Sequence, residues 1–203
     1  MLNLIFFGTP GAGKGTQAEI IAAERSLFHL SSGSILRQEI ESGELGPEIK
    51  HYLDSGTLVP DSLITTMMEN AITKNISGNG FIFDGYPRSI SQAEALYKFF
   101  ENNNLHLNAV INIEISEDEA KKRILLRGKT SGRSDDNPEV IAQRFKTYHE
   151  QTKPLLDYYQ ELGKIINING EPDIETVATN INQTIEEIKK PLQYRSGCFN
   201  SKF

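Results

Sequence analysis

The chain has 203 residues, a formal net charge of -6 and one cysteine, Cys198. This length allows one domain with a substantial core, and the acidic total argues against a protein that coats nucleic acid. A single cysteine excludes an internal disulfide and a zinc site made of clustered cysteines, and no apolar stretch is long enough to cross a membrane. We therefore expect a cytoplasmic protein.

The first predicted strand, residues 2–7, leads into the loop Gly8-Thr9-Pro10-Gly11-Ala12-Gly13-Lys14-Gly15-Thr16, and the residues that follow favour a helix. A phosphate chain accepts hydrogen bonds from consecutive backbone N–H groups only where no Cβ blocks its approach. The lysine and the helix N-terminus add positive charge. A plain turn needs only one or two glycines, so the loop predicts a nucleotide phosphate site.

Four further β-type runs follow, separated by polar segments long enough for helices. They cover residues 28–30, 81–83, 109–115 and 164–168. Parallel strands need crossovers of a dozen or more residues, so this alternation predicts an α/β fold with helices on both faces of a five-stranded parallel sheet. Ligands of such sheets lie at the carboxyl ends of the strands.

Two segments interrupt this alternation. Residues 31–59 contain glycine breaks and predict a small inserted subdomain of short helices. Residues 128–138 predict a polar loop between two helices, with the basic residues and glycine hinges of a lid. We place the core at residues 1–30, 60–125 and 137–190, the lid at 126–136, and a loosely held tail at 191–203.

Four of the eight arginines lie between residues 123 and 144, in or beside the predicted lid. Arg123 and Arg127 are four residues apart on a predicted helix, where like charges repel unless an anion lies between them. Arginine binds phosphate oxygens in a planar fork, and phosphoryl transfer requires neutralisation of charge on three oxygens. For any single arginine, solvated surface charge is the simpler interpretation. The cluster as a whole favours a phosphate site.

Asp84 ends the predicted strand at 81–83 and is followed by Gly85-Tyr86-Pro87-Arg88. An acidic residue at this place is where a phosphate-loop enzyme holds magnesium, directly or through water. A strand-end aspartate that caps a turn is the alternative interpretation. The arginine four residues later favours the magnesium site.

Several motifs together resemble the nucleoside monophosphate kinases, and the adenylate kinases most closely. They are the loop at residues 8–17, Ser32-Gly33-Ser34-Ile35-Leu36-Arg37, Asp84-Gly85-Tyr86-Pro87-Arg88 with Gln92, Arg123 with Arg127, and Ser131-Gly132-Arg133-Ser134-Asp135-Asp136 with Arg144. These matches follow one another in order along the chain. The loop ending Gly-Lys-Gly-Thr, in place of the strict Gly-Lys-Ser/Thr, is itself typical of this family.

The resemblance implies a P-loop NTPase-type core whose monophosphate-binding subdomain and short lid close over ATP and AMP to exchange a γ-phosphoryl group and yield two ADP. Closure excludes water, which would otherwise turn the kinase into an ATPase. Mg²⁺ would accompany ATP, with Asp84 holding it through water and Thr16 as a further candidate ligand. The implied partners are ATP, AMP and ADP, with no nucleic acid and no membrane, and the expected state is a monomer.

The family pattern also implies roles for individual positions. The catalytic residues would be Lys14, Arg88, Arg123, Arg127, Arg133 and Arg144. ATP would contact Gly11, Ala12, Gly13, Lys14, Gly15, Thr16, Arg127 and Pro172. AMP would contact Ser32, Arg37, Thr57, Leu58, Val59, Gly85, Tyr86, Pro87, Arg88, Gln92, Arg133 and Arg144.

Gln92 bears on the choice of base, because adenine presents an amino donor beside a ring acceptor and a glutamine amide matches both. The chain departs from the family at Ser32, which replaces a threonine, and at Ser34, where an aspartate normally supports the water shell of magnesium. Its short lid lacks the insertion that some relatives fix with four cysteines around zinc. No structural zinc is therefore expected.

Three alternatives remain open. A UMP/CMP kinase belongs to the same class, and relatives of that kind usually place an asparagine near the position of Gln92. A non-catalytic nucleotide-dependent switch needs one nucleotide site and would not require a second phosphate grip at Arg37 and Arg88. A kinase of a small alcohol shares the loop but does not account for Gln92.

Overall fold

In the computed structural model, residues 1–43, 45–131, 133 and 135–190 are described. The predicted tail at 191–203, with Cys198, lies outside the described residues, as do positions 132 and 134 of the predicted lid.

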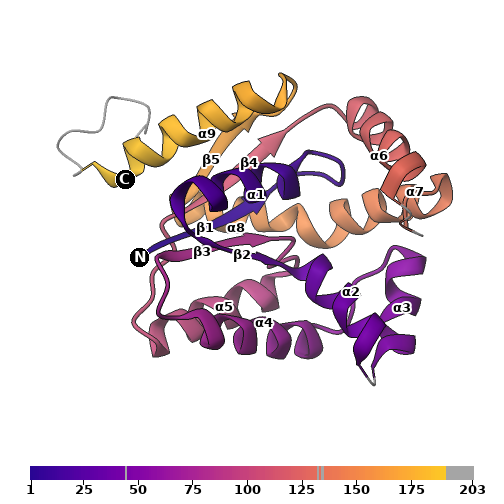
Figure 1. Cartoon of the computed structure of the whole chain (residues 1–203), viewed down its shortest axis with the longest axis horizontal. Helices are drawn as coiled ribbons and strands as arrows, with labels where there is room; N and C mark the ends of the chain where they lie inside the picture. The colour runs from indigo at the N-terminus through magenta and orange to yellow at the C-terminus, as the bar shows by residue number, and fades with distance from the viewer. Residues whose placement is uncertain (44, 132, 134, 191–203) are drawn as a thin grey trace.

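Five strands form one parallel sheet in the order β2-β3-β1-β4-β5 (Figure 1). Every predicted strand is confirmed, with ends that differ by no more than one residue. The strands are β1 (Leu2–Phe7), β2 (Phe28–Ser31), β3 (Gly80–Asp84), β4 (Ala109–Glu114) and β5 (Ile165–Asn169).

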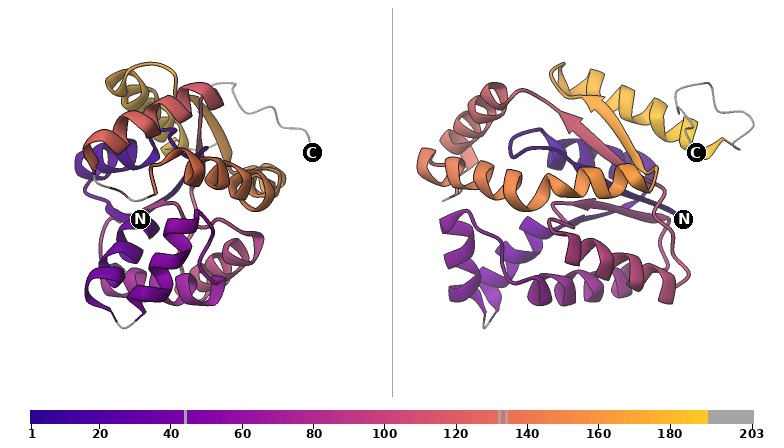
Figure 2. Two further views of the ribbon diagram at one scale, coloured as in Figure 1. Left: turned by 90° about the vertical axis from the view of Figure 1, so that its right-hand side faces the viewer. Right: turned by 180° about the vertical axis from the view of Figure 1, so that it is seen from behind.

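Helices cover both faces of this sheet, as the alternation of elements predicts (Figures 1 and 2). The covering helices are α1 (Lys14–Arg25), α4 (Asp61–Asn75), α5 (Ile90–Asn102), α8 (Pro154–Glu161) and α9 (Ile174–Lys189). Alternate side chains of β1 enter different cores: Phe6 packs with Ile21 and Ile181 of α1 and α9, whereas Ile5 packs with Met68 on the opposite face. The strands are thus buried on both sides, which accounts for their continuous apolar runs.

The remaining helices lie at one end of the molecule, beyond the carboxyl ends of the strands (Figure 1). They are α2 (Ser32–Ser42), α3 (Gly46–Ser55), α6 (Glu117–Ser131) and α7 (Pro138–Thr147). The π-helix η1 (Tyr148–Thr152) connects α7 to α8 and lies beside the end of β1. Helices α2 and α3 lie within the segment predicted as an insertion, and α6 and α7 flank the predicted lid loop. Both groups therefore border the edge of the sheet where ligands of parallel α/β folds bind.

The loop between α6 and α7 is shorter than the predicted span of 128–138. Because α6 continues through Ser131, the prediction of a loop over residues 128–131 is wrong. Gly128 serves a close approach here: a Cβ at this position would lie 2.8 Å from the backbone oxygen of Asp136. The start of α7 follows the ordinary rules, since Pro138 opens the helix and the Asn137 side chain accepts a hydrogen bond from a backbone N–H in the first turn.

Candidate active site

A cleft with a volume of about 650 Å³ opens at the carboxyl edge of the sheet. It brings together residues from the glycine loop, from the α2–α3 segment, from the connection after β3, from α6 and α7, and from the connection between β5 and α9. The predicted site residues that line it are Gly11, Ala12, Gly13, Lys14, Gly15, Thr16, Ser32, Arg37, Thr57, Leu58, Val59, Asp84, Gly85, Arg88, Gln92, Arg123, Arg127, Arg133, Arg144 and Pro172.

Tyr86 and Pro87, which the resemblance assigns to AMP, do not line this cleft. The side chain of Tyr86 is buried in the core, and its hydroxyl donates to the backbone oxygen of Gln92 at 3.4 Å. Pro87 lines a smaller adjoining cavity of about 70 Å³. The structure thus places these two residues behind the cleft, where they support the segment that carries Arg88.

The glycine loop ends at α1 with an open helix terminus. Gly13 precedes the helix in a left-handed conformation (φ 87°), and no side chain in the described part of the protein caps the first turn. The N–H groups at this end therefore remain available to an anion. Gly11 and Gly13 both have positive φ, but only Gly11 is also packed closely against the protein. A Cβ on Gly11 would lie 2.5 Å from the backbone oxygen of Ala120, whereas one on Gly13 would meet no protein atom within 4 Å.

Lys14 lies folded against its own loop, and its Nζ donates to the backbone oxygens of Gly8 and Thr9, both at 2.8 Å. Burial lowers the pKa of this amine to about 7; Asp84 opposes the shift, and nearby arginines, led by Arg88, add to it. The ammonium form is therefore short of negative charge in the absence of a ligand. A phosphate group would supply that charge.

Asp84 ends β3 with a carboxylate that faces the loop, since a Cβ on Gly15 would lie 3.3 Å from its Oδ2. Burial by itself raises its pKa, but His29 and Lys14 reverse the effect and hold the pKa of this carboxyl below its usual value. The His29 Nε2 atom lies 3.5 Å from Oδ2 and has no hydrogen-bond partner among the described residues. Sequence reasoning did not single out this histidine.

The donor set around Asp84 fits a magnesium ion that brings most of its own ligands. Mg²⁺ keeps several waters and is bound in such sites by one or two carboxylates together with substrate phosphates. Thr16, in the first turn of α1, lines the same cleft. Among the described residues, no three His, Cys, Asp or Glu side chains are grouped as an all-protein metal site would require.

Two further arginines that line the cleft are Arg37 and Arg88. Arg88 donates from Nε to the backbone oxygen of Gly85 at 2.8 Å. Burial is the largest cause that lowers the pKa of both side chains. The next largest cause is the charge of Arg133 for Arg37, and the charge of Arg144 for Arg88. Guanidinium groups nevertheless stay charged in proteins. The cleft therefore holds a concentration of positive charge that an anion would relieve.

Gln92 is 2 % exposed, and its amide is held by two partners of opposite kind. Its Oε1 accepts a hydrogen bond from the backbone N–H of Arg88 at 2.7 Å, and its Nε2 donates to Asp61 Oδ1 at 2.6 Å. Sequence reasoning missed Asp61, which belongs to no motif; the only local signal is that it follows Pro60 at the start of α4.

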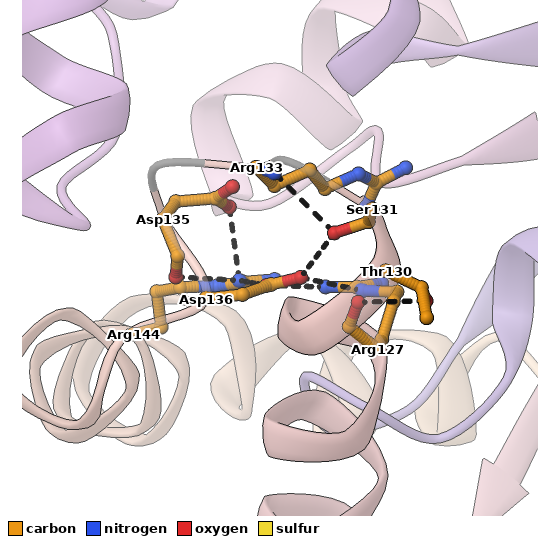
Figure 3. Close-up of polar contacts among 7 residues, drawn as sticks. All are labelled: Arg127, Thr130, Ser131, Arg133, Asp135, Asp136 and Arg144. Carbon is orange, nitrogen blue, oxygen red and sulfur yellow. Dashed lines mark hydrogen bonds and ion pairs between the residues drawn. The ribbon is translucent and has the colours of Figure 1, made fainter.

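In the lid, one buried carboxylate holds two of the predicted arginines (Figure 3). Asp136, whose side chain is fully buried, accepts two hydrogen bonds from Arg127, at 2.8 and 2.6 Å, and one from Arg144 at 3.1 Å. Arg144 also pairs with Asp135 at 2.9 Å. The motif that contains Asp136 is part of the family resemblance, but sequence reasoning gave this residue no role.

Arg123 pairs with a different carboxylate from the one that holds Arg127. It pairs with Glu119 at 2.9 Å and donates to the backbone oxygens of Gly170 and Glu171 at 3.0 and 3.2 Å. The spacing of Arg123 and Arg127 along α6 is thus accounted for by protein carboxylates, and a bound anion is not needed to explain it. Arg123 also ties α6 to the connection that precedes α9.

Comparisons with known proteins agree in what they indicate. The family model described as "Adenylate kinase" matches residues 6–164. A curated adenylate kinase of Parabacteroides distasonis is 45 % identical over 190 residues, which are 93 % of this chain and 100 % of the relative. Those of Bacteroides thetaiotaomicron and Leptospira biflexa are 41 % and 40 % identical over 189 and 186 residues, covering 93 % and 91 % of this chain and all of each relative.

Proposed function

Since the chain belongs to the adenylate kinase family, we propose that its cleft transfers the γ-phosphoryl group of ATP to AMP, and we assign the parts of this reaction to individual residues. The observation that carries the proposal is that one cleft is lined by two separate groups suited to phosphate. These are the glycine loop with Lys14, and the pair Arg37 and Arg88. One nucleotide would need only one of them.

ATP occupies the half of the cleft next to α1. The backbone N–H groups between Gly11 and Thr16, together with the open start of the helix, bind its phosphates. Lys14 exchanges the carbonyl oxygens of Gly8 and Thr9 for phosphate oxygens and bridges to the group in transfer. The adenine lies between Arg127 and the segment at Pro172, both of which line the cleft.

AMP occupies the half next to α2 and α3. Arg37 and Arg88 bind its phosphate, which relieves the crowding of positive charge described above. Gln92 contacts the base. The rest of the AMP pocket is formed by Ser32, Thr57, Leu58, Val59 and Gly85.

Between the two nucleotides, arginines neutralise the charge that spreads over the phosphoryl oxygens during transfer. The residues proposed for this are Arg123, Arg127, Arg133 and Arg144, together with Lys14 and Arg88. Closure of the lid excludes water, so that AMP is the acceptor.

The magnesium ion that accompanies ATP supplies further neutralisation of phosphate charge when it is bound. In this chain Asp84 would hold it through water, and the hydroxyl of Thr16 is a further candidate. Structural zinc has no place in the proposal. No helix within the described ranges is long and apolar enough to span a bilayer. The cytoplasmic location, the monomeric state and the lack of a nucleic-acid or membrane partner stay predictions from composition and from the family resemblance.

The sharpest test compares ATP with a two-headed adenosine pentaphosphate analogue that fills both halves. Calorimetry on the whole chain should show the analogue binding about a hundredfold or more tightly than ATP. Arg37→Ala should remove most of that advantage and leave the Kd of ATP within twofold. If the analogue binds no more tightly than ATP, the second phosphate site does not exist and a single-site switch becomes the better interpretation.

Steady-state assays with AMP, CMP and UMP as acceptors, at saturating Mg-ATP, separate the two kinase alternatives. The proposal expects the highest kcat/KM for AMP. A preference for either pyrimidine nucleotide would instead favour the UMP/CMP kinase.

A further inference from the structure

The side-chain amide of Gln92 has one orientation that satisfies its neighbours. The backbone N–H of Arg88 can only donate, and it is directed at Oε1 at 2.7 Å. The carboxylate of Asp61 lies 2.6 Å from Nε2. Gln92 is almost fully buried, so both contacts are made away from bulk water.

Asp61 acts purely as an acceptor in this network. Its Oδ2 accepts hydrogen bonds from the hydroxyls of Ser89, at 2.7 Å, and Ser91. Burial by itself raises its pKa, but the hydrogen bonds from Ser91, Ser89 and Gln92 outweigh this and hold the pKa of the carboxyl below its usual value. At neutral pH the group is a carboxylate, which has no proton to donate.

Rotation of the Gln92 amide by half a turn would therefore be penalised twice. The Nε2 group would face the N–H of Arg88, so that two donors meet. The Oε1 atom would face the carboxylate of Asp61, so that two acceptors meet. In the observed orientation the amide keeps one N–H and one oxygen lone pair for a ligand, with their positions fixed.

The fixed orientation of the Gln92 amide affects base recognition, because two kinds of purine present opposite patterns of hydrogen-bond donors and acceptors. Adenine offers an amino donor next to a ring-nitrogen acceptor. A 6-oxopurine such as hypoxanthine has nearly the same shape but offers an oxygen acceptor next to a ring N–H donor. A glutamine that is free to rotate can match both, whereas one held in a single orientation matches one of them.

We propose that Asp61 is a specificity-determining positioning residue: by fixing the amide of Gln92, it makes the acceptor site take AMP and reject nucleoside monophosphates with a 6-oxopurine base. The inference rests on the proposed function, which places Gln92 against the AMP base. Asp61 acts through Gln92, and a polar site with fixed partners discriminates strongly because the wrong base leaves buried groups unpaired.

The test measures kcat/KM for AMP and for inosine monophosphate with Mg-ATP as donor. In Asp61→Asn the side chain can donate or accept, so the substitution removes the penalty on rotation at residue 61 and leaves only the one at the N–H of Arg88. The AMP-to-inosine monophosphate ratio of kcat/KM should fall at least tenfold, mainly through a lower KM for inosine monophosphate, with the KM for ATP within twofold. Asp61→Ala, which removes the fixed acceptor altogether, should also lower the ratio and serves if Asp61→Asn does not fold.

Two control variants separate the possible failures. Ser91→Ala removes a hydrogen bond to the same carboxylate but leaves the contact between Asp61 and Gln92, so the ratio should stay within twofold of the unmodified protein. Gln92→Leu should bring the ratio close to one. Suppose that Gln92→Leu brings the ratio close to one but the folded Asp61 variants leave the ratio unchanged: the role of Asp61 is then refuted and the proposed function stands. The same conclusion follows if Ser91→Ala lowers the ratio as much as the Asp61 variants do. If Gln92→Leu leaves the ratio unchanged, Gln92 does not contact the base and both assignments fail.

Discussion

Arg127 and Asp136 form a two-pronged ion pair, with Nε–Oδ2 and Nη2–Oδ1 distances of 2.8 and 2.6 Å, that joins the end of α6 to the loop before α7. The carboxylate is fully buried, while the Arg127 side chain is 36 % exposed. The same carboxylate reaches Arg144, so one aspartate sets the positions of two arginines in the cleft. The geometry of the lid thus depends on a residue that touches no predicted substrate.

We expect Asp136→Asn to weaken both the fold and the reaction. The free energy of unfolding should fall by about 2 kcal/mol, less than for a wholly buried pair because water reaches Arg127. The kcat should fall about tenfold or more, because misplaced arginines neutralise the transferring group poorly. Urea denaturation and steady-state assays measure the two effects. Asp135→Asn, which disturbs Arg144 but leaves Arg127 paired, is the control and should have a smaller effect on both.

The contribution of Asp136 to stability should disappear in acid. Burial by itself raises its pKa, but Arg127 reverses this and holds the pKa of the folded carboxyl below its usual value. A group of this kind stabilises the fold above the unfolded pKa of about 4 and loses that contribution as the pH falls through the folded pKa. Urea denaturation of the unmodified protein and Asp136→Asn should therefore differ at pH 7 and converge below about pH 4. A difference that persists unchanged at pH 3 would contradict this assignment.

Lys14→Met should lower kcat by about a thousandfold or more, because it removes a positive charge from the group in transfer. The fold should survive, since the ammonium of Lys14 is costly to bury and methionine is not. Turnover and thermal denaturation are measured together. Lys50→Met is the matched control, because Lys50 pairs with Asp54 on the surface of α3 and lies outside the cleft.

Binding of ATP at pH 8 should take up close to one proton. With a pKa of about 7, Lys14 is mostly neutral at this pH in the free protein, and bound phosphate raises its pKa and restores the proton. Calorimetric titrations in buffers of different ionisation enthalpy measure the uptake. The variant Lys14→Arg keeps its positive charge at all pH values, so its binding of ATP should take up no proton at this side chain. A binding heat that does not depend on the buffer would contradict the prediction for the unmodified protein.

Gly11 and Gly13, two of the glycines with positive φ in the loop, should separate stability from binding. Gly11→Ala places a Cβ 2.5 Å from a backbone oxygen of α6, so the free energy of unfolding should fall by about 3 kcal/mol. Gly13→Ala meets no protein atom and should cost about 1 kcal/mol of backbone strain, yet raise the Kd of ATP about tenfold or more. Urea denaturation and calorimetry with ATP distinguish them. If Gly11→Ala and Gly13→Ala lower the free energy of unfolding equally, the prediction is contradicted.

The sequence predicts the sheet and the cleft well because both depend on local patterns. The run Phe81-Ile82-Phe83 is apolar at every position, which is typical of a strand buried on both faces, and the glycines near Lys14 identify a phosphate loop in isolation. Contacts between segments remote in sequence are not predictable in this way. The hydroxyl of Thr147, for example, donates to the backbone oxygen of Gly56 at 3.1 Å, across 91 positions.

Side-chain direction is the second kind of information that a single sequence does not contain. Tyr86 lies between the cleft residues Gly85 and Arg88 in the chain, yet its side chain is buried in the core. Asp61 is the opposite case, a residue that was not predicted but contacts a residue of the site. No motif includes it, and the packing of α4 against α5 brings it to Gln92. Composition and spacing identify the chemistry of a site, whereas the residues that orient it depend on tertiary packing.

The proposed hold on the phosphates at the start of α1 uses main-chain N–H groups, and every amino acid except proline has one. A substitution of a side chain does not remove these main-chain hydrogen-bond donors, unless it introduces proline. Gly8, Gly11 and Gly13 are constrained by their positive φ, whereas an exchange of the side chain at Thr9 leaves the main-chain N–H groups in place. Substitutions that alter which nucleotide is accepted are therefore expected at side chains such as Asp61 and Gln92, and not along this main chain.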